Sequence, residues 1–243
     1  MRVMVAALLA VAAQSQQQPA TRVEFEIVSV KPGDPANPTS SGHTTPGHLV
    51  LRNATLKTLL MNAFRVNEYQ IAGGPKWIDS AKFNVDAKLP AGAPMSDAPL
   101  MMQAMLAGRF KLSAHRETRT LREYALVVAK GGPKFGKPDE GDHNGVVTSQ
   151  SDIRITGYGR PISDLARMLV DAANAPVIDR TGLKGQYDFD LKFGPLLTTP
   201  RQGDDDLPSI FTVVQVQLGL KLQPIKGPVE VLVIDRAEMP TAN

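Results

Sequence analysis

The sequence predicts an α+β fold of two homologous lobes, each a small, mostly antiparallel sheet with short helices packed on one face. Three observations support this prediction. Two long stretches share one pattern of apolar, turn and charged positions, the expected helices are short, and short strands alternate with them. Helices of about two turns are not stable alone. Their apolar stripes must therefore pack against a sheet.

The internal repeat is clearest in two pairs of segments. Residues 83–88 match residues 187–192, and residues 100–112 match residues 210–222 at a constant offset. The second pair ends in Phe-Lys-Leu in one copy and in Leu-Lys-Leu in the other. A duplicated pattern of this kind predicts architecture but assigns no chemistry.

The repeat sets the expected domain organisation. Residues 21–130 are expected to form the first α+β repeat and residues 151–243 the second. Residues 131–150 are rich in glycine, lysine and aspartate and poor in apolar residues, so they are expected to link the two repeats. Residues 1–20 are expected to be a signal peptide and a polar spacer.

Alternation and capping signals place the elements of each repeat. The hydroxyl of Thr55 can cap a helix by accepting a backbone N–H, and residues 32–47 are expected to be a loop because they are rich in Pro, Gly, Ser and Thr. In the first repeat we expect strands at 23–30, 49–51, 69–71 and 83–89, helices at 55–64 and 99–107, and a hairpin of strands 109–116 and 123–129 turning at 118–121. In the second we expect strands at 153–156, 177–178 and 186–193, helices at 162–171 and 209–217, and two final strands at 218–223 and 229–234.

The N-terminus has the pattern of an export signal. Arg2 precedes an apolar run at residues 3–13, which is too short to span a bilayer and contains an A-x-A site at residues 10–12. A fused tag or a buried first strand are the alternatives. No later stretch is apolar enough to cross a membrane, so we expect the mature protein to be periplasmic or secreted.

Composition excludes several classes of chemistry. The chain of 243 residues contains 27 basic and 24 acidic side chains, a net charge of +3 that gives little support to a nucleic-acid partner. It has no cysteine, which excludes disulfides, zinc-thiolate sites, iron-sulfur clusters and a cysteine nucleophile. No phosphate-binding or dinucleotide glycine motif and no G-x-S-x-G is present. We therefore predict no cofactor, no metal and no catalytic residue.

The histidines carry little evidence for a site. His43 and His48 flank a Thr-Thr-Pro segment and could form a loop site, although a solvated loop is the favoured interpretation. His115 is expected on a strand beside Arg116 and Glu117, and the second repeat has no matching histidine. A catalytic role for His115 would require a positioned partner that the sequence does not identify.

Residues 179–185 and one tryptophan are the remaining binding candidates. The favoured interpretation of Asp179 is a tight turn in which its carboxylate accepts a hydrogen bond from Thr181 or Gly182. The alternative is a rim loop in which Arg180 and Lys184 contact an anionic ligand or partner.

Trp77 is interpreted either as a side chain buried under the adjoining loop or as an exposed aromatic anchor.

A basic stretch is interpreted as a charged strand edge that stays soluble and unpaired. It contains Arg109, Lys111, Arg116, Arg119 and Arg122.

A family resemblance rests on five segments, residues 115–117, 124–134, 177–183, 217–222 and 233–235. They resemble an uncharacterised family of secreted acidobacterial proteins with a domain of unknown function, sometimes fused to a sensor-type membrane metallopeptidase. The resemblance implies a location and a context in the cell envelope rather than a mechanism. The element order of each repeat is also similar to the short N-terminal domain of secretins and TonB-dependent transducers, which is an analogy of fold.

These observations predict a non-catalytic binding module that acts as a sensor or adaptor in the cell envelope. Its partner would be a protein or a small ligand, and the candidate contacts are Trp77, His115, Asp179, Arg180 and Lys184. One alternative is an envelope hydrolase with a site between the lobes, formed by His115 or residues 141–144. The other is a structural envelope protein with a self-associating edge strand.

Overall fold

The computed structural model describes residues 23–37, 39–135, 145–148, 153–194 and 208–240. The fold is α+β, as predicted. The expected signal peptide, the polar spacer and residues 141–144 lie outside the described residues. Among the described residues, no helix combines the length and apolarity that a membrane span requires.

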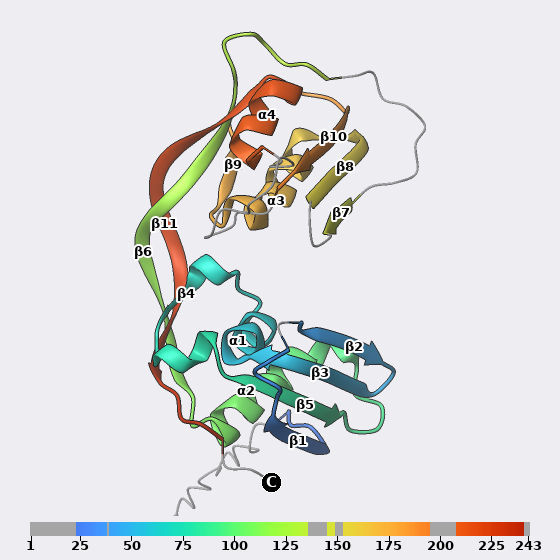
Figure 1. Ribbon diagram of the computed structural model, residues 1–243, viewed down its shortest axis with the longest axis vertical. Helices are drawn as coiled ribbons and strands as arrows, with labels where there is room; N and C mark the ends of the chain where they lie inside the picture. The colour runs from blue at the N-terminus through green and yellow to red at the C-terminus, as the bar shows by residue number, and fades with distance from the viewer. Residues whose placement is uncertain (1–22, 38, 136–144, 149–152, 195–207, 241–243) are drawn as a thin grey trace, which may run out of the picture.

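The N-terminal half contains an antiparallel sheet in the order β1-β5-β3-β2, with two helices on one face (Figure 1). Its elements are β1 (Ile27–Pro32), β2 (Ser41–Thr45), β3 (His48–Thr55), β5 (Lys82–Lys88), α1 (Leu56–Phe64) and α2 (Ala98–Arg109). β5 buries Phe83, Val85 and Ala87 under the helices and exposes the alternate residues more, as the sequence pattern predicts. The hydroxyl of Thr55 accepts a hydrogen bond from the backbone N–H of Thr58 and caps α1.

The C-terminal half contains a second sheet, in the order β10-β8-β7, and two further helices. Its elements are β7 (Gly145–Thr148), β8 (Ile153–Arg160), β10 (Tyr187–Phe193), α3 (Ile162–Ala173) and α4 (Ile210–Leu218). Gly157 is required by packing, because a Cβ at this position would lie 2.2 Å from the buried ring of Phe189. Ser209 caps α4 through the backbone N–H of Thr212.

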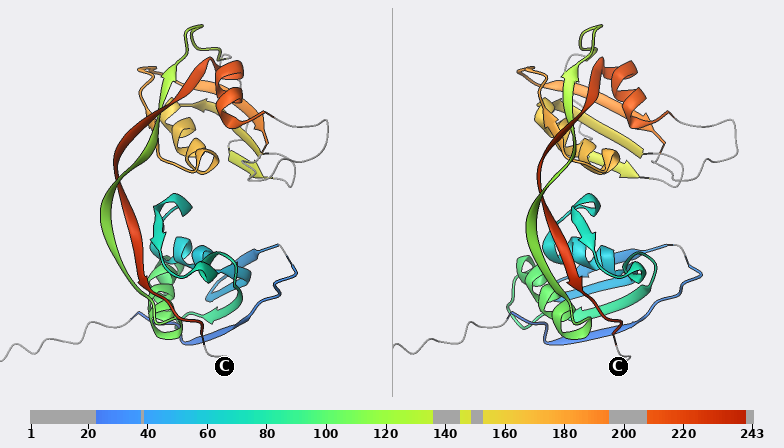
Figure 2. Two further views of the ribbon diagram at one scale, coloured as in Figure 1. Left: turned by 60° about the vertical axis from the view of Figure 1, so that its left-hand side comes forward. Right: turned by 90° about the vertical axis from the view of Figure 1, so that its left-hand side faces the viewer.

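Two long strands run past both halves and join them (Figures 1 and 2). β6 (Ser113–Val128) and β11 (Leu220–Arg236) pair antiparallel along nearly their whole lengths and are called the ribbon below. β4 (Ile71–Gly73) pairs parallel to one end of β11, and β9 (Val177–Asp179) pairs parallel to one end of β6. The sheet order is β4-β11-β6-β9.

The ribbon contributes to both apolar cores from one face, called the inner face below. In the N-terminal core it buries Leu232 and Ile234, and in the C-terminal core it buries Tyr124 and Leu126. Directly paired residues of the two strands share a face. Even-numbered residues therefore line the inner face, because Leu232 pairs with Arg116 and the register is unbroken to Leu220.

The predicted hairpin of strands 109–116 and 123–129 is wrong, because β6 is continuous where its turn was expected, and the two strands expected at 218–223 and 229–234 form one continuous strand, β11. Residues 118–121 are Thr-Arg-Thr-Leu, which lacks the glycine, asparagine or aspartate that tight hairpin turns need. Thr120 pairs instead with Pro228 of the distant strand. At Gly227 a Cβ would lie 2.1 Å from the Glu123 carboxylate, so this glycine gives room to a neighbouring side chain of the ribbon.

The loop expected at residues 32–47 also contains a strand, β2, which pairs with β3. β7 falls within the expected linker at 131–150. The domain boundaries and the duplication remain predictions. The structure adds that each core contains residues from both sides of that linker.

Candidate functional site

His115 lies on the face of the ribbon opposite to the inner face and is exposed. Its Nδ1 is 3.0 Å from Oδ2 of Asp235, and its Nε2 is 3.7 Å from Oε2 of Glu117. The hydrogen bond to Asp235 raises the pKa of His115 above its usual value. The arrangement is a surface ion-pair cluster.

The predicted turn after β9 is present. Oδ1 of Asp179 accepts hydrogen bonds from the backbone N–H and the hydroxyl of Thr181, at 2.9 and 2.7 Å. The backbone N–H of Arg180 donates to the carbonyl of Leu126, which fixes the turn to the ribbon. The side chains of Arg180 and Lys184 are exposed.

Trp77 is half-buried and packs on the N-terminal core. Its ring centroid lies 6.2 Å from that of Phe83 and 6.4 Å from that of Phe110. Trp77 and His115 therefore belong with the N-terminal half, whereas the Asp179 turn follows β9 beside the C-terminal core. The structure does not bring the sequence-predicted candidates together.

A pocket of about 400 Å³ lies where both halves meet the ribbon. The N-terminal half contributes Tyr69 from the short 3₁₀ turn η1 (Glu68–Gln70), and the remaining walls come from β6, the end of α3 and α4. The lining residues are Tyr69, Leu121, Arg122, Tyr124, Ala173, Asn174, Ala175 and Phe211. A pocket shared by separate parts of the chain is a common location for ligands.

A local capping arrangement holds Tyr69 at this pocket. The backbone N–H of Asn67 donates to Oε1 of Gln70 at 3.0 Å, and Nε2 of Gln70 donates to the carbonyl of Glu230 at 2.9 Å. The second bond ties η1 to β11. Burial raises the pKa of the Tyr69 phenol, which therefore remains protonated near neutral pH and can donate a hydrogen bond.

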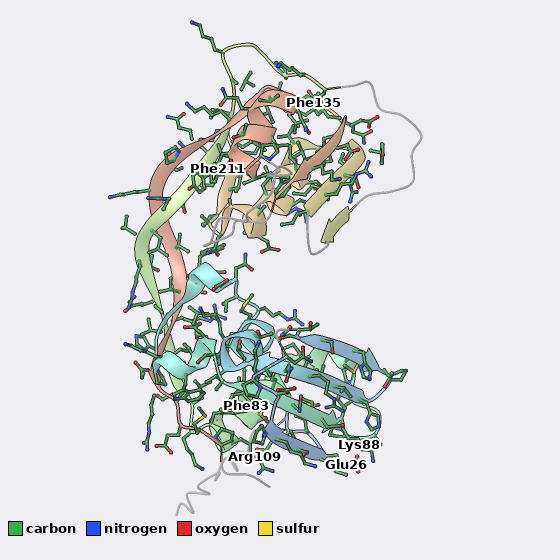
Figure 3. All side chains as sticks on the ribbon, viewed as in Figure 1. Glu26, Phe83, Lys88, Arg109, Phe135 and Phe211 are labelled. Carbon is green, nitrogen blue, oxygen red and sulfur yellow. The ribbon has the colours of Figure 1, made fainter. Side chains whose placement is uncertain are left out.

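The wall from the C-terminal half combines aromatic and amide groups. The rings of Tyr124 and Phe211 have centroids 5.1 Å apart, and Figure 3 shows Phe211 beside the ribbon. Asn174 ends α3 in the left-handed conformation, with φ of 44°, and its backbone N–H satisfies carbonyls of the last turn. Its exposed side chain can therefore serve a ligand.

Arg122 differs from the other arginines of the ribbon. Arg116 donates to Oε1 of Glu230 at 2.5 Å and to the carbonyl of Phe64 at 3.0 Å, and Arg119 pairs with Glu117. Arg122 is exposed on the inner face and has neither a hydrogen-bond nor an ion-pair partner among the described residues.

Its direct cross-strand neighbour, Lys226, is also exposed and has no such partner in the described part of the chain. Like charges directly opposite one another destabilise a strand pair. The cross-strand pair of Arg122 and Lys226, called the rung below, therefore departs from a rule that the other directly opposite pairs of the ribbon follow.

A second pocket, of about 410 Å³, lies between β2 and α1 in the N-terminal half. Its polar lining includes Thr44, Thr58 and Asn62, and its apolar lining includes Leu51 and Met102. His43 contributes to its rim from β2 rather than from a loop. Among the described residues, its lining contains no lysine, arginine or carboxylate, so the pocket between the halves offers the stronger chemistry.

Sequence reasoning missed most of the pocket between the halves. The sequence shows Arg122 as one of several basic residues, but only its pairing with β11 places Lys226, and no acidic residue of the described chain, opposite it. Tyr69, Asn174 and Phe211 carry no motif that could have identified them. Phe211 stands at the start of α4 and Tyr69 within η1, a placement that assigns neither residue a role.

Comparison with known proteins gives one match. The model of a family described as a protein of unknown function, DUF3738, matches residues 57–237. Neither the curated proteins nor the solved structures contain a match to the chain.

Proposed function

Because the chain belongs to the DUF3738 family, whose description assigns no activity, we propose a function from the geometry. We propose that the protein is a non-catalytic binding module, periplasmic or secreted, whose ligand occupies the pocket between the two halves. One observation carries this proposal: both halves and the ribbon build a single pocket of about 400 Å³ that contains an arginine with no hydrogen-bond or ion-pair partner among the residues that the structure describes.

The lining favours binding over hydrolysis. Its side chains offer aromatic faces, a phenol, an amide and a guanidinium, which recognise a ligand without transferring protons near neutral pH. A hydrolase would need a general base within hydrogen-bond reach of its substrate. His115, the base considered from the sequence, lies on the opposite face of the ribbon from Arg122 and Tyr124.

The pocket is also suited to sensing. A ligand that contacts Tyr69 on one side and Phe211 on the other binds best to one arrangement of the two halves. It would stabilise that arrangement over others, and this population shift is what a sensor or adaptor transmits. The export signal in the sequence supports the envelope location. The presence of residues 1–13 at the N-terminus of protein recovered from the periplasm would contradict the proposed processing.

A thermal-shift panel tests the binding function. The panel contains a carboxylic acid, an amine, a sugar and a dipeptide, and we expect at least one class to raise the Tm by an amount that grows with concentration. Tyr69→Ala removes one wall and should abolish that shift. Tyr158→Ala, on β8 outside the pocket, is the matched control and should retain it. The proposal fails if no class shifts the Tm or if Tyr69→Ala leaves the shift unchanged.

A further inference from the structure

We propose that the ligand of this pocket is a small organic monoanion with a flat apolar body. Its acid group would lie at the edge of the pocket, between Arg122, which lines the pocket, and Lys226, which is opposite Arg122 on β11 and is not a lining residue; its body would pack against Tyr124 and Phe211. The inference rests on the proposed function, because it concerns the same pocket, and it adds the chemical class of the ligand.

The cation pair supports the acid group. Arg122 and Lys226 are directly opposite in the antiparallel register and point to the same inner face. Both are exposed, and neither has an ion-pair partner in the part of the chain that the structure describes. A carboxylate between them would replace their repulsion with two charge-assisted hydrogen bonds.

The neighbouring positions of the ribbon extend the same face. Thr118 and Thr120 are exposed and lie on the inner face with Arg122, because side chains alternate along a strand. Their hydroxyls are further hydrogen-bond donors beside the cation pair. The inner face between the two cores thus carries hydroxyl donors beside the cation pair, together with the Glu230 carboxylate, which is paired with Arg116.

The aromatic wall supports the flat body. The Tyr124 and Phe211 rings are 5.1 Å apart, and Leu121, Ala173 and Ala175 complete the apolar lining. A volume of about 400 Å³ lies within the range of small-molecule sites. A ring stacked on this wall would cover Phe211 and Leu121, which are half-buried, and would contact Tyr124, which is already buried in the C-terminal core.

Negative groups elsewhere restrict the ligand to one negative charge. Asp171 and Glu123 are near enough to Tyr69 to act on it electrostatically, although burial is the larger influence on that phenol. Ala173, Asn174 and Ala175 form the C-terminal end of α3, where the helix dipole is negative. A second acid group at the Tyr69 or α3 side would be repelled, which leaves the Arg122 side of the pocket for the acid. Glu123 lies on β6 next to Arg122, but it is buried and on the opposite face of the ribbon.

Isothermal titration in low-salt buffer tests the inference with benzoate as the probe. Inorganic phosphate and benzylamine are the comparison compounds, and Arg122→Gln and Lys226→Gln are the variants. We expect benzoate to bind more tightly than either comparison compound, and each variant to weaken it by about tenfold. Arg119→Gln is the matched control, because Arg119 lies on the same strand but on the other face and is paired with Glu117. It should leave benzoate affinity unchanged.

The possible outcomes separate this inference from the proposed function. Benzylamine binding more tightly than benzoate would overturn the charge assignment, and phosphate binding as tightly as benzoate would overturn the flat body. Unchanged affinity in both glutamine variants would remove the cation pair from the site. If benzoate fails but another compound of the thermal-shift panel binds in a manner that depends on Tyr69, the ligand class is wrong and the binding function stands. If no compound binds, both are wrong.

Discussion

Two stretches of the same ribbon differ in whether their basic residues have acidic partners. Near the N-terminal core, Arg116 has Glu230 and the Phe64 carbonyl as partners, and Arg119 has Glu117. A few residues further along β6, Arg122 faces Lys226 across the ribbon, and neither has an acidic partner among the described residues. Both stretches have the same backbone pairing, so strand geometry does not explain the difference.

The proposed binding site would explain it. Arg116 and Arg119, which have acidic partners, lie where the ribbon needs only to remain paired and soluble, whereas Arg122 lines the pocket between the halves. Violations of local rules are expected to concentrate at functional sites. The comparison therefore identifies the rung of Arg122 and Lys226 as the place where the ribbon departs from what stability alone would select.

The buried ends of the ribbon should respond most strongly to substitution. Leu126 is fully buried in the C-terminal core, so we expect Leu126→Ala to lower the free energy of unfolding by about 2–5 kcal/mol. Thr120→Ala, on the exposed middle of the same strand, should change it by less than about 0.5 kcal/mol. Urea denaturation followed by far-UV circular dichroism measures both.

The same variant tests whether the ribbon couples the two cores. Trp77 packs on the N-terminal core, so its fluorescence reports on the core that does not contain Leu126. Because β6 and β11 contribute to both cores, we expect Leu126→Ala to shift the fluorescence and circular dichroism transitions equally. A fluorescence transition left at its wild-type midpoint would show that the cores unfold independently and that the ribbon does not couple them.

The sequence predicts the parts of this fold that local patterns determine. The alternation of Phe83, Val85 and Ala87 identified β5, and Thr55 was recognised as the cap of α1. β2 was missed because it is an edge strand whose residues are all exposed and include no apolar side chain. Its formation depends on hydrogen bonding to β3, which composition does not reveal.

The ribbon could not be predicted for a different reason. Strands at 109–116 and 123–129 are compatible with a local hairpin or with one long strand, because both arrangements bury the same apolar residues. The choice depends on pairing with β11, far along the chain. The candidate site depends on that choice, since only the register with β11 places Lys226 opposite Arg122, where neither has an ion-pair partner in the described ranges of the chain.

Reversing one charge of the Arg122 and Lys226 pair should raise the free energy of unfolding and abolish ligand binding. Lys226→Glu would place a carboxylate opposite Arg122, and a cross-strand ion pair of this kind contributes about 0.2–1 kcal/mol. We expect a small rise in the urea midpoint with an unchanged m-value, together with loss of benzoate binding, because the new carboxylate occupies Arg122. Lys221→Glu is the matched control, since Lys221 pairs with Val127 and gains no ion pair. A Lys226→Glu protein no more stable than wild type would mean that the opposed cations carry no cost.

The smallest effect is expected at the compensated end of the ribbon, where His115 is hydrogen-bonded to Asp235. This bond raises the pKa of His115, so its contribution to stability is complete below the unfolded pKa of about 6.5 and is lost as pH rises through the folded pKa. A titration of the His115 ring signals by NMR should give a pKa above 6.5, and Asp235→Asn should lower it. Arg122 lies beyond the ion-pair cluster, so Arg122→Gln should leave the pKa of His115 unchanged. A His115 pKa that does not respond to Asp235→Asn would show that the exposed pair does not form in solution, and the contrast between a compensated and an uncompensated stretch would then rest on Arg116 and Arg119 alone.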